Sequence, residues 1–142
     1  MRESIGKYIS SISKYIHRYI NKRADNYNLN THQLHILQIL YNNEGISQNG
    51  LVERVRTNKI SISKSLDGLL EEGYIEKRKN EKDKRIKNIY LTEKGHRIRT
   101  QIKNILKDVT EVLTNNFSKE EDIVIRKLLK KMSDNIYEEI NL

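Results

Sequence analysis

The 142-residue sequence contains no cysteine, proline or tryptophan, and only six glycines. Without cysteine it can form neither a disulfide, a thiolate metal site nor a cysteine-based redox switch. The N-terminus has no apolar run of the signal-peptide type, and no stretch of about 18 apolar residues could serve as a transmembrane helix. These absences favour a cytoplasmic protein without a membrane partner.

Sequence motifs of common enzymes are also missing. The chain has no glycine-rich phosphate loop, no His-Glu-x-x-His motif and no cysteine nucleophile. The acidic pairs Glu71-Glu72 and Glu120-Glu121 are adjacent in sequence, so in a helix their side chains would diverge onto solvated faces. We therefore expect no catalytic residues and no cofactor.

The composition favours a single basic domain. At 36% hydrophobic content the chain can bury one modest core, so we expect one domain over residues 1–142. The net charge of +8 and a pI of about 9.6 favour anionic partners, nucleic acid first and an anionic membrane surface second. Charge alone also fits a soluble protein whose surface is simply charged.

The segment from Thr57 to Leu91 shows the clearest pattern in the chain. Its first half predicts a short amphipathic helix, since apolar residues recur at helical spacing on one face. These inward residues are Ile62, Leu66, Leu69 and Leu70, whereas Ile60, Ser61 and Lys64 lie on the opposite face. Thr57 and Asn58 are N-cap residue types, and Gly73 stands where a helix-ending residue must accept a positive φ.

A basic β-hairpin is predicted directly after this helix. Two strand-like runs, 74–79 and 87–91, flank the polar segment from Asn80 to Ile86. Between positions 77 and 87, seven basic residues face only Glu81 and Asp83. The basic residues are Lys77, Arg78, Lys79, Lys82, Lys84, Arg85 and Lys87. Such a density of positive charge favours a nearby anion, and nucleic-acid phosphate is the first candidate.

The segment before this helix predicts the other half of a helix-turn-helix. Asn30 and Gln33 form a capping-box pattern that begins a helix, which Gly45 should end. Ile46 can then enter the sheet as a short strand, and Ser47 can cap the next helix. Together with the basic hairpin, this order is the sequence form of a winged helix-turn-helix.

Two histidines in this segment are candidates for a metal pair. His32 and His35 lie three residues apart on the helix, so they do not share the i, i+4 face of a typical paired site. We expect solvent-facing or capping roles for them and no metal site.

Apolar stripes also mark both ends of the chain. The first helix carries Ile5, Ile9, Ile12, Ile16 and Ile20, and a long helix capped by Thr92 carries Ile98, Ile102, Ile105, Val109 and Val112. A Ser118/Glu121 capping box begins the last helix, which carries Ile125, Leu128, Leu129, Met132, Ile136 and Ile140. Such stripes favour a dimer interface, although a core-facing stripe within one chain is the alternative.

Five segments together resemble the MarR (multiple antibiotic resistance regulator) family of bacterial transcription factors. They are LVERV at 51–55, SISKSLD at 61–67, LLEEGYI at 69–75, DKR at 83–85 and LTEKG at 91–95. Arg56 departs from the family, in which glycine is common at this turn, and the absence of cysteine excludes the family's thiol-based peroxide sensors.

The resemblance implies a mainly α fold with a small β-hairpin wing. A winged helix-turn-helix at 29–91 would be flanked by dimerisation helices at 1–25 and 92–142. We expect a homodimer that binds double-stranded DNA at a palindromic operator, as a repressor. The alternatives are a sequence-nonspecific, nucleoid-associated DNA-binding protein and a winged helix used only for protein contacts.

The helix after Asn58 is expected to enter the major groove with its N-terminal end first. Ile60 can contact a thymine methyl group, Ser61 a base edge or a phosphate, and Lys64 a guanine or the backbone. Phosphate contacts are expected from Thr57, Asn58, Lys59 and Ser63, helped by the partial positive charge of the helix N-terminus.

The hairpin tip is expected to reach the minor groove. Arg85 is our candidate for insertion, because a narrow AT-rich groove concentrates negative potential. Asp83 resembles the family's orienting acid, which would hold an arginine in position, although both could simply be loop charges. The other wing candidates are Arg78, Lys82, Lys84 and Lys87.

The resemblance also implies control by a small molecule. Family members often release DNA when a small aromatic, commonly anionic, compound binds between the dimer body and the winged unit. Tyr8, Tyr15, His17 and Tyr19 could line such a cleft if the first helix crosses it. They could equally be packing and surface residues.

Overall fold

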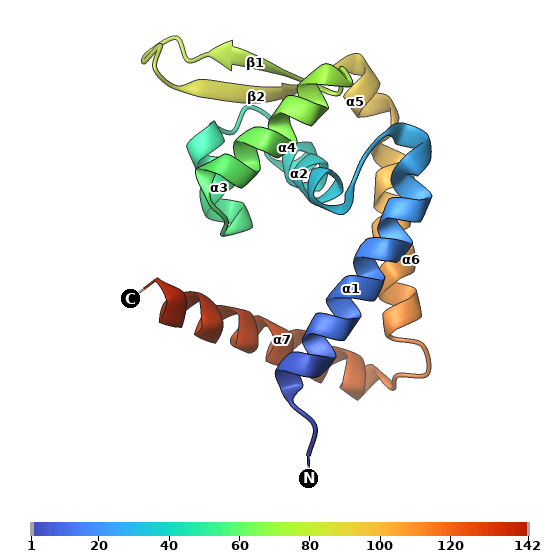
Figure 1. Ribbon diagram of the computed structural model, residues 1–142. Helices are drawn as coiled ribbons and strands as arrows, with labels where there is room; N and C mark the ends of the chain where they lie inside the picture. The colour runs from blue at the N-terminus through green and yellow to red at the C-terminus, as the bar shows by residue number, and fades with distance from the viewer. Residues whose placement is uncertain (1, 142) are drawn as a thin grey trace. The chain divides into compact units, whose positions relative to one another are not determined.

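Capped helices and one two-stranded hairpin make up the computed structural model, which describes residues 2–141 (Figure 1). The elements are α1 (Ile5–Ala24), η1 (Asp25–Tyr27), α2 (Thr31–Asn42), α3 (Gln48–Val55), α4 (Lys59–Glu71), β1 (Ile75–Lys79), β2 (Lys87–Leu91), α5 (Glu93–Arg97), α6 (Arg99–Leu113) and α7 (Lys119–Ile140). This architecture confirms the predicted mainly α fold with a hairpin wing.

The chain divides into two compact units, Met1–Val109 and Thr110–Leu142. The first contains the helix-turn-helix, the wing and α1. The second contains α7. The functional division into a DNA-binding unit at 29–91 and dimerisation segments at both ends stays a prediction.

Side-chain caps fix where the helices of the first unit begin. Asn30 and Gln33 form the predicted capping box of α2: the Gln33 backbone N–H donates to Asn30 Oδ1 (2.9 Å) and the Asn30 N–H to Gln33 Oε1 (3.0 Å). Ser47 caps α3 through the Gly50 N–H, at 3.0 Å. These contacts satisfy amides that the first helical turn leaves without partners.

The turn between α3 and α4 contains a left-handed residue that is not glycine. Arg56 has φ 56° and ψ 47°, so this turn forms even though arginine stands where glycine is common in the family. The end of α4 follows the expected pattern: Gly73 has φ 77°, and the Tyr74 N–H bonds to the Leu69 carbonyl (3.0 Å). The chain then passes directly into β1.

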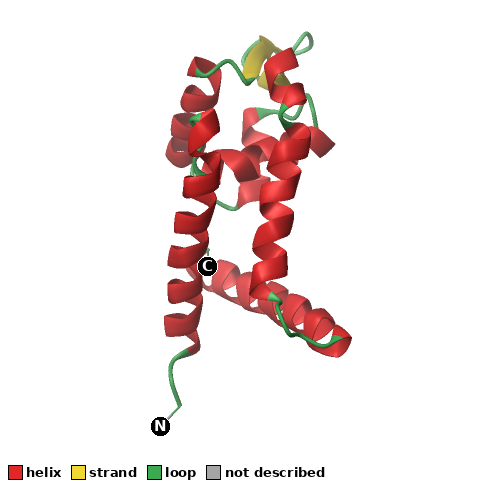
Figure 2. Ribbon diagram, turned by 90° about the vertical axis from the view of Figure 1, so that its right-hand side faces the viewer, coloured by secondary structure: helices red, strands yellow, loops and turns green. Residues whose placement is uncertain are grey.

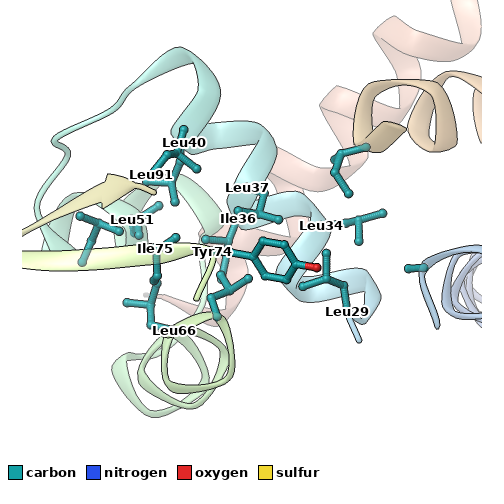
Figure 3. Close-up of a cluster of buried hydrophobic side chains, with 14 of the residues drawn as sticks. Leu29, Leu34, Ile36, Leu37, Leu40, Leu51, Leu66, Tyr74, Ile75 and Leu91 are labelled. Atoms are coloured by element: carbon teal, nitrogen blue, oxygen red, sulfur yellow. The ribbon is translucent and has the colours of Figure 1, made fainter. Parts of the chain in front are cut away.

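The core of the first unit lies between α2, α4 and the hairpin (Figure 3). Its largest fully buried side chains come from α2, α3, α4 and β2 and from α1 and α6. They are Ile20, Leu34, Ile36, Leu37, Leu40, Leu51, Ile62, Leu66, Leu69, Ile89 and Ile102. Burial of the inward face of α4 leaves its opposite face free for contacts.

The hairpin is antiparallel, and its register pairs Ile75 with Leu91 and Lys79 with Lys87. A third segment joins β2 at its free edge: the Ile89 N–H donates to the Ile46 carbonyl (2.9 Å), and the Gly45 N–H donates to the Ile89 carbonyl (2.8 Å). The predicted short strand at Ile46 is reduced to an isolated bridge between Ser47 and Asn88. We attribute this to the role of Ser47 as N-cap, because the chain turns into α3 at that residue.

The long helix predicted after Thr92 is wrong as a continuous element. It is divided into α5 and α6 at Ile98, which has φ −91° and ψ 4°. The short α5 is held against α2 and the turn that joins α4 to β1, since Tyr41 Oη donates to the Gly95 carbonyl (2.7 Å) and Thr92 Oγ1 to the Gly73 carbonyl (2.6 Å). With α5 fixed in this way, the chain changes direction before α6.

α6 runs beside α1, as Figures 1 and 2 both show. Arg23 on α1 and Asp108 on α6 form an ion pair of 2.6 Å. Ile102 and Ile105 are buried in the core of the first unit. This part of the apolar stripe therefore packs into the core of its own chain, which was the alternative to a dimer interface.

In the second unit, α7 begins at the predicted capping box of Ser118 and Glu121. None of its residues is buried. Among the helices of residues 2–141, none combines the length and apolar character that a membrane crossing requires.

Candidate nucleic-acid interface

The outward face of α4 carries the residues expected to contact DNA bases. Ile60 is 82% exposed, more than any other large apolar side chain that the structure describes. A shallow surface groove, here called the α4 groove, follows this face and extends to the first residue of α3. It is lined by Gln48, Lys59, Ile60, Ser63, Lys64 and Asp67.

The N-terminal end of α4 is organised by Asn58. Its Oδ1 accepts the Ser61 backbone N–H at 2.8 Å, so its carbonyl oxygen is occupied as a helix cap. The amide nitrogen can still donate to a phosphate. Ser61 and Lys59 are exposed, whereas Thr57 is half-buried.

The wing tip holds one arginine in a fixed position. Arg85 Nε donates to Asp83 Oδ1 and Arg85 Nη2 to Asp83 Oδ2, each at 3.0 Å. The Arg85 backbone N–H also donates to Asp83 Oδ1 at 3.0 Å. These hydrogen bonds hold the pKa of the Asp83 carboxyl below its ordinary value, so the pair stays charged at neutral pH. The Arg85 side chain is nevertheless 90% exposed and available to a partner.

Asn80 shapes the loop from which this pair projects. Its Oδ1 accepts the backbone N–H groups of Lys82 (2.9 Å) and Asp83 (3.1 Å), as an Asx turn does. The Ile86 N–H closes the loop on the Asp83 carbonyl at 3.0 Å. Hydrogen bonds of the loop backbone therefore fix the position from which the Asp83 carboxylate extends.

The wing cations differ in their surroundings. Lys82, Lys84 and Lys87 are exposed. Arg78 instead pairs with Glu76 and lies over the ring of Tyr90, with its guanidinium carbon 4.1 Å from the ring centroid. Its charge is thus partly compensated within the hairpin.

Two residues of the α4 groove, Gln48 and Asp67, were not predicted from the sequence. The signal for Asp67 was present, since it follows Ile60, Ser63 and Lys64 at helical spacing on one face. Gln48 belongs to a different helix, so no local spacing could reveal that it reaches the same groove.

The role of the aromatic residues proposed for an effector cleft, all of which lie on α1, stays a prediction. Tyr8 and Tyr15 are exposed on α1. The His17 ring lies edge-on against His32, with 5.3 Å between centroids, and Tyr19 Oη accepts a hydrogen bond from Arg23. Within residues 2–141, no group of three or more histidine or acidic side chains could hold a metal ion.

A pocket of about 230 Å³ lies between α2 and α6. It is lined by Gln38, Tyr41, Asn42, Arg99, Ile102 and Lys103, and by none of the four aromatic candidates. The Arg99 guanidinium lies 5.4 Å from the Tyr41 ring centroid. Burial raises the pKa of the Tyr41 phenol to about 12, so this hydroxyl is neutral at physiological pH. The pocket therefore presents two cations and a neutral phenol.

Comparison with known proteins agrees with this geometry. A MarR family sequence model matches residues 29–87. The uncharacterised helix-turn-helix regulator YybA of Bacillus subtilis is 31% identical over 97 residues, which are 68% of this chain and 65% of YybA. The matched part thus spans less than two thirds of that relative.

Solved structures extend the similarity to most of the chain. A MarR transcriptional regulator from Methanosarcina mazei has 31% identity and a TM-score of 0.85, covering 92% of this chain and 94% of its own. The S. aureus MepR–DNA complex shares the fold, with 22% identity and a TM-score of 0.87, covering 94% of this chain and 99% of its own. This chain belongs to the MarR family of transcriptional regulators.

Proposed function

We propose that the protein is a homodimeric, sequence-specific DNA-binding repressor. The observation that carries the proposal is the combination, within one unit, of an exposed Ile60 on α4 and the fixed Asp83–Arg85 pair at the wing tip. MepR, which shares the fold, is known in complex with DNA.

In this proposal α4 enters the major groove, which is about 12 Å wide. Ile60 contacts a thymine methyl group, whereas Ser61 and Lys64 contact base edges or phosphates. Phosphate contacts by Thr57, Asn58, Lys59 and Ser63 fix the position of the helix on the backbone. Base contacts then supply sequence preference, and phosphate contacts supply salt-dependent affinity.

The wing contacts the adjacent minor groove through Arg85. Because Asp83 already restricts the guanidinium, less side-chain entropy is lost on binding than for a free arginine. Lys82, Lys84 and Lys87 support the same contact through phosphates, whereas Arg78 is drawn toward Glu76 and Tyr90.

Dimerisation is supported by apolar side chains that each unit leaves uncovered. On α1, Ile5 is 64% exposed, and in the second unit Ile140 is 73% exposed. Other exposed apolar residues are Tyr8, Ile9, Ile12 and Tyr15 on α1, and Ile123, Val124, Leu128, Leu129 and Ile136 on α7. Exposed apolar residues in such numbers mark an interaction surface, and a second copy would cover them. Such a dimer would bind half-sites about one helical turn, roughly 10 bp, apart.

Release by a small aromatic anion is the regulatory part of the proposal. The pocket between α2 and α6 offers Arg99 and Lys103 for a carboxylate, and Tyr41 and Ile102 for a ring. A ligand shifts the dimer only if it binds the DNA-incompetent state more tightly. We expect simple aromatic carboxylates to raise the thermal unfolding midpoint and to weaken DNA binding, and an Arg99→Ala variant to lose both effects.

The DNA-binding proposal is tested by fluorescence anisotropy on two duplexes at two salt concentrations. One carries the DNA upstream of the protein's own gene, and the other is a scrambled sequence of equal composition. A preference of a hundredfold or more that persists at the higher salt supports an operator-specific regulator. Equal, strongly salt-sensitive binding to these and to duplexes selected from a random pool would indicate a nucleoid-associated protein instead.

A further inference from the structure

Asp67 stands out among the residues that line the α4 groove because it carries a negative charge. It lies one turn beyond Ser63 and Lys64 on the outward face of α4. The side chain is exposed, and within residues 2–141 it makes no hydrogen bond or ion pair. The other charged side chains lining the groove, Lys59 and Lys64, are cationic.

A carboxylate in this place restricts what the groove can contact. A phosphate would repel the Asp67 carboxylate, so Asp67 cannot be one of the residues that fix the protein on the DNA backbone. Ionised aspartate only accepts hydrogen bonds. In the major groove, hydrogen-bond donors are found only on the cytosine N4 and adenine N6 amino groups.

Cytosine fits this acceptor better than adenine does. The adenine N6 amino group lies next to the N7 acceptor, whose lone pair repels a carboxylate, whereas guanine and thymine present acceptors at O6, N7 or O4. Lys64 lies three residues before Asp67 on the same helix face and supplies a donor for guanine O6 or N7. The pair therefore matches the acceptors and donor that a G·C pair displays across the major groove.

From this we infer that Asp67 is a specificity-determining residue that accepts a hydrogen bond from a cytosine N4 amino group in each half-site. This inference rests on the proposed binding of α4 in the major groove. It adds that the operator contains one invariant C·G pair per half-site, whose guanine Lys64 can contact, next to the base pair read by Ile60. The same carboxylate lowers affinity for DNA in general. This increases the ratio of the affinity for the operator to the affinity for other sequences.

The test compares three proteins in a selection from random duplex DNA: the wild type, Asp67→Asn and Glu71→Gln. Both substitutions remove one negative charge from α4, but Glu71 is exposed one turn further on and does not line the α4 groove. Asparagine can bond to adenine N6 and N7 together. Circular dichroism and the thermal midpoint verify that each variant is folded.

For the wild type we expect cytosine at one symmetric position, with a loss of roughly fivefold to hundredfold in affinity when another base replaces it. Asp67→Asn should change this preference to adenine and bind scrambled DNA more tightly. Glu71→Gln should keep the cytosine preference. The Glu71→Gln control separates a change in base preference from the general gain in DNA affinity that follows removal of a negative charge.

Two results would overturn the inference in different ways. If the wild type selects an operator and Asp67→Asn selects the same bases, Asp67 does not read DNA, although the proposed function stands. If the wild type selects no sequence at all, the proposed function fails and the inference fails with it.

Discussion

The wing tip shows how two residues can prepare a contact before a partner arrives. Asp83 binds the Arg85 guanidinium through both carboxylate oxygens and also accepts the Arg85 backbone N–H. Because the hairpin loop fixes Asp83, the exposed Arg85 side chain extends from a defined position. The value of this pair lies in orientation, since exposed ion pairs contribute little to folding stability.

The first prediction therefore separates binding from stability. Arg85→Ala should weaken operator binding more than tenfold and leave the helical circular-dichroism signal unchanged. Arg126→Ala is the matched control, since Arg126 is another exposed arginine held by an aspartate, Asp122, at 3.0 Å on α7. Fluorescence anisotropy measures both, and equal affinity of Arg85→Ala and the wild type would refute the role assigned to the wing.

A second prediction concerns Tyr41 and alkaline pH. The pKa of its phenol is about 12 in the folded protein and about 10 in the unfolded chain, because burial disfavours the phenolate. Between these values the folded state binds more protons, so the free energy of unfolding decreases as pH rises from about 10 to about 12. The contribution is fully present below pH 10.

Tyr41→Phe should remove this part of the pH dependence. It should also cost about 1 kcal/mol at neutral pH, because the hydrogen bond to the Gly95 carbonyl is lost. Urea unfolding at pH 8 and pH 11 tests both effects. If the wild type and the variant lose equal stability between the two pH values, the environment assigned to Tyr41 is wrong.

At the residue scale, sequence reasoning succeeded where the cause was local. The outward position of Ile60 follows from helical spacing, and the pairing of Asp83 with Arg85 is a contact between residues two apart. The capping role of Asn58 also followed from its residue type and is confirmed. That Gln48 reaches the α4 groove was not predicted. The latter depends on how α3 packs on α4, which no local pattern encodes.

At the scale of elements, the break between α5 and α6 is the main difference from the sequence-based expectation. The sequence predicts one helix that begins at the Thr92 cap and carries the apolar stripe as far as Val112, and no proline or glycine lies at Ile98. We attribute the break to tertiary contacts, because α5 packs so closely on Tyr74 that a Cβ atom at Gly95 would lie 2.2 Å from the Tyr74 carbonyl oxygen. Capping boxes, by contrast, were predictable because their residues are three apart.

The same close contact gives a prediction with a matched control. Gly95→Ala should lower the free energy of unfolding by about 1–3 kcal/mol, since backbone atoms must move to admit the methyl group. Gly6→Ala, in the exposed first turn of α1, places its Cβ 3.4 Å from Ser4 Oγ and should be neutral or stabilising by up to about 1 kcal/mol. Chemical denaturation should show a loss of stability for Gly95→Ala and none for Gly6→Ala, and a neutral Gly95→Ala would contradict this packing.

At the scale of the whole molecule, the apolar residues of α1 and α7 need a partner. Repeats at helical spacing predicted these stripes, but only burial separates their roles: Ile20, Ile102 and Ile105 belong to the core of one chain, whereas Ile136 is 62% exposed. Spacing alone cannot distinguish a core stripe from an interface, because both need the same periodicity.

The corresponding prediction is a change in oligomeric state. Light scattering should give the wild type twice the chain mass of 16.8 kDa. Ile136→Glu should shift this toward the monomer and reduce operator affinity, without unfolding the first unit. Lys127→Glu, a charge change at an exposed polar site of α7, should remain dimeric; a monomeric wild type would refute the dimer.

Footprinting on the tightest DNA site obtained by selection shows how the protein sits on its operator. We expect two symmetric protected half-sites about one helical turn, roughly 10 bp, apart, with flanking minor-groove protection that disappears in Arg85→Ala. Protection of a single half-site, or uniform protection without boundaries, would contradict a dimer that reads its operator through α4 and the wing.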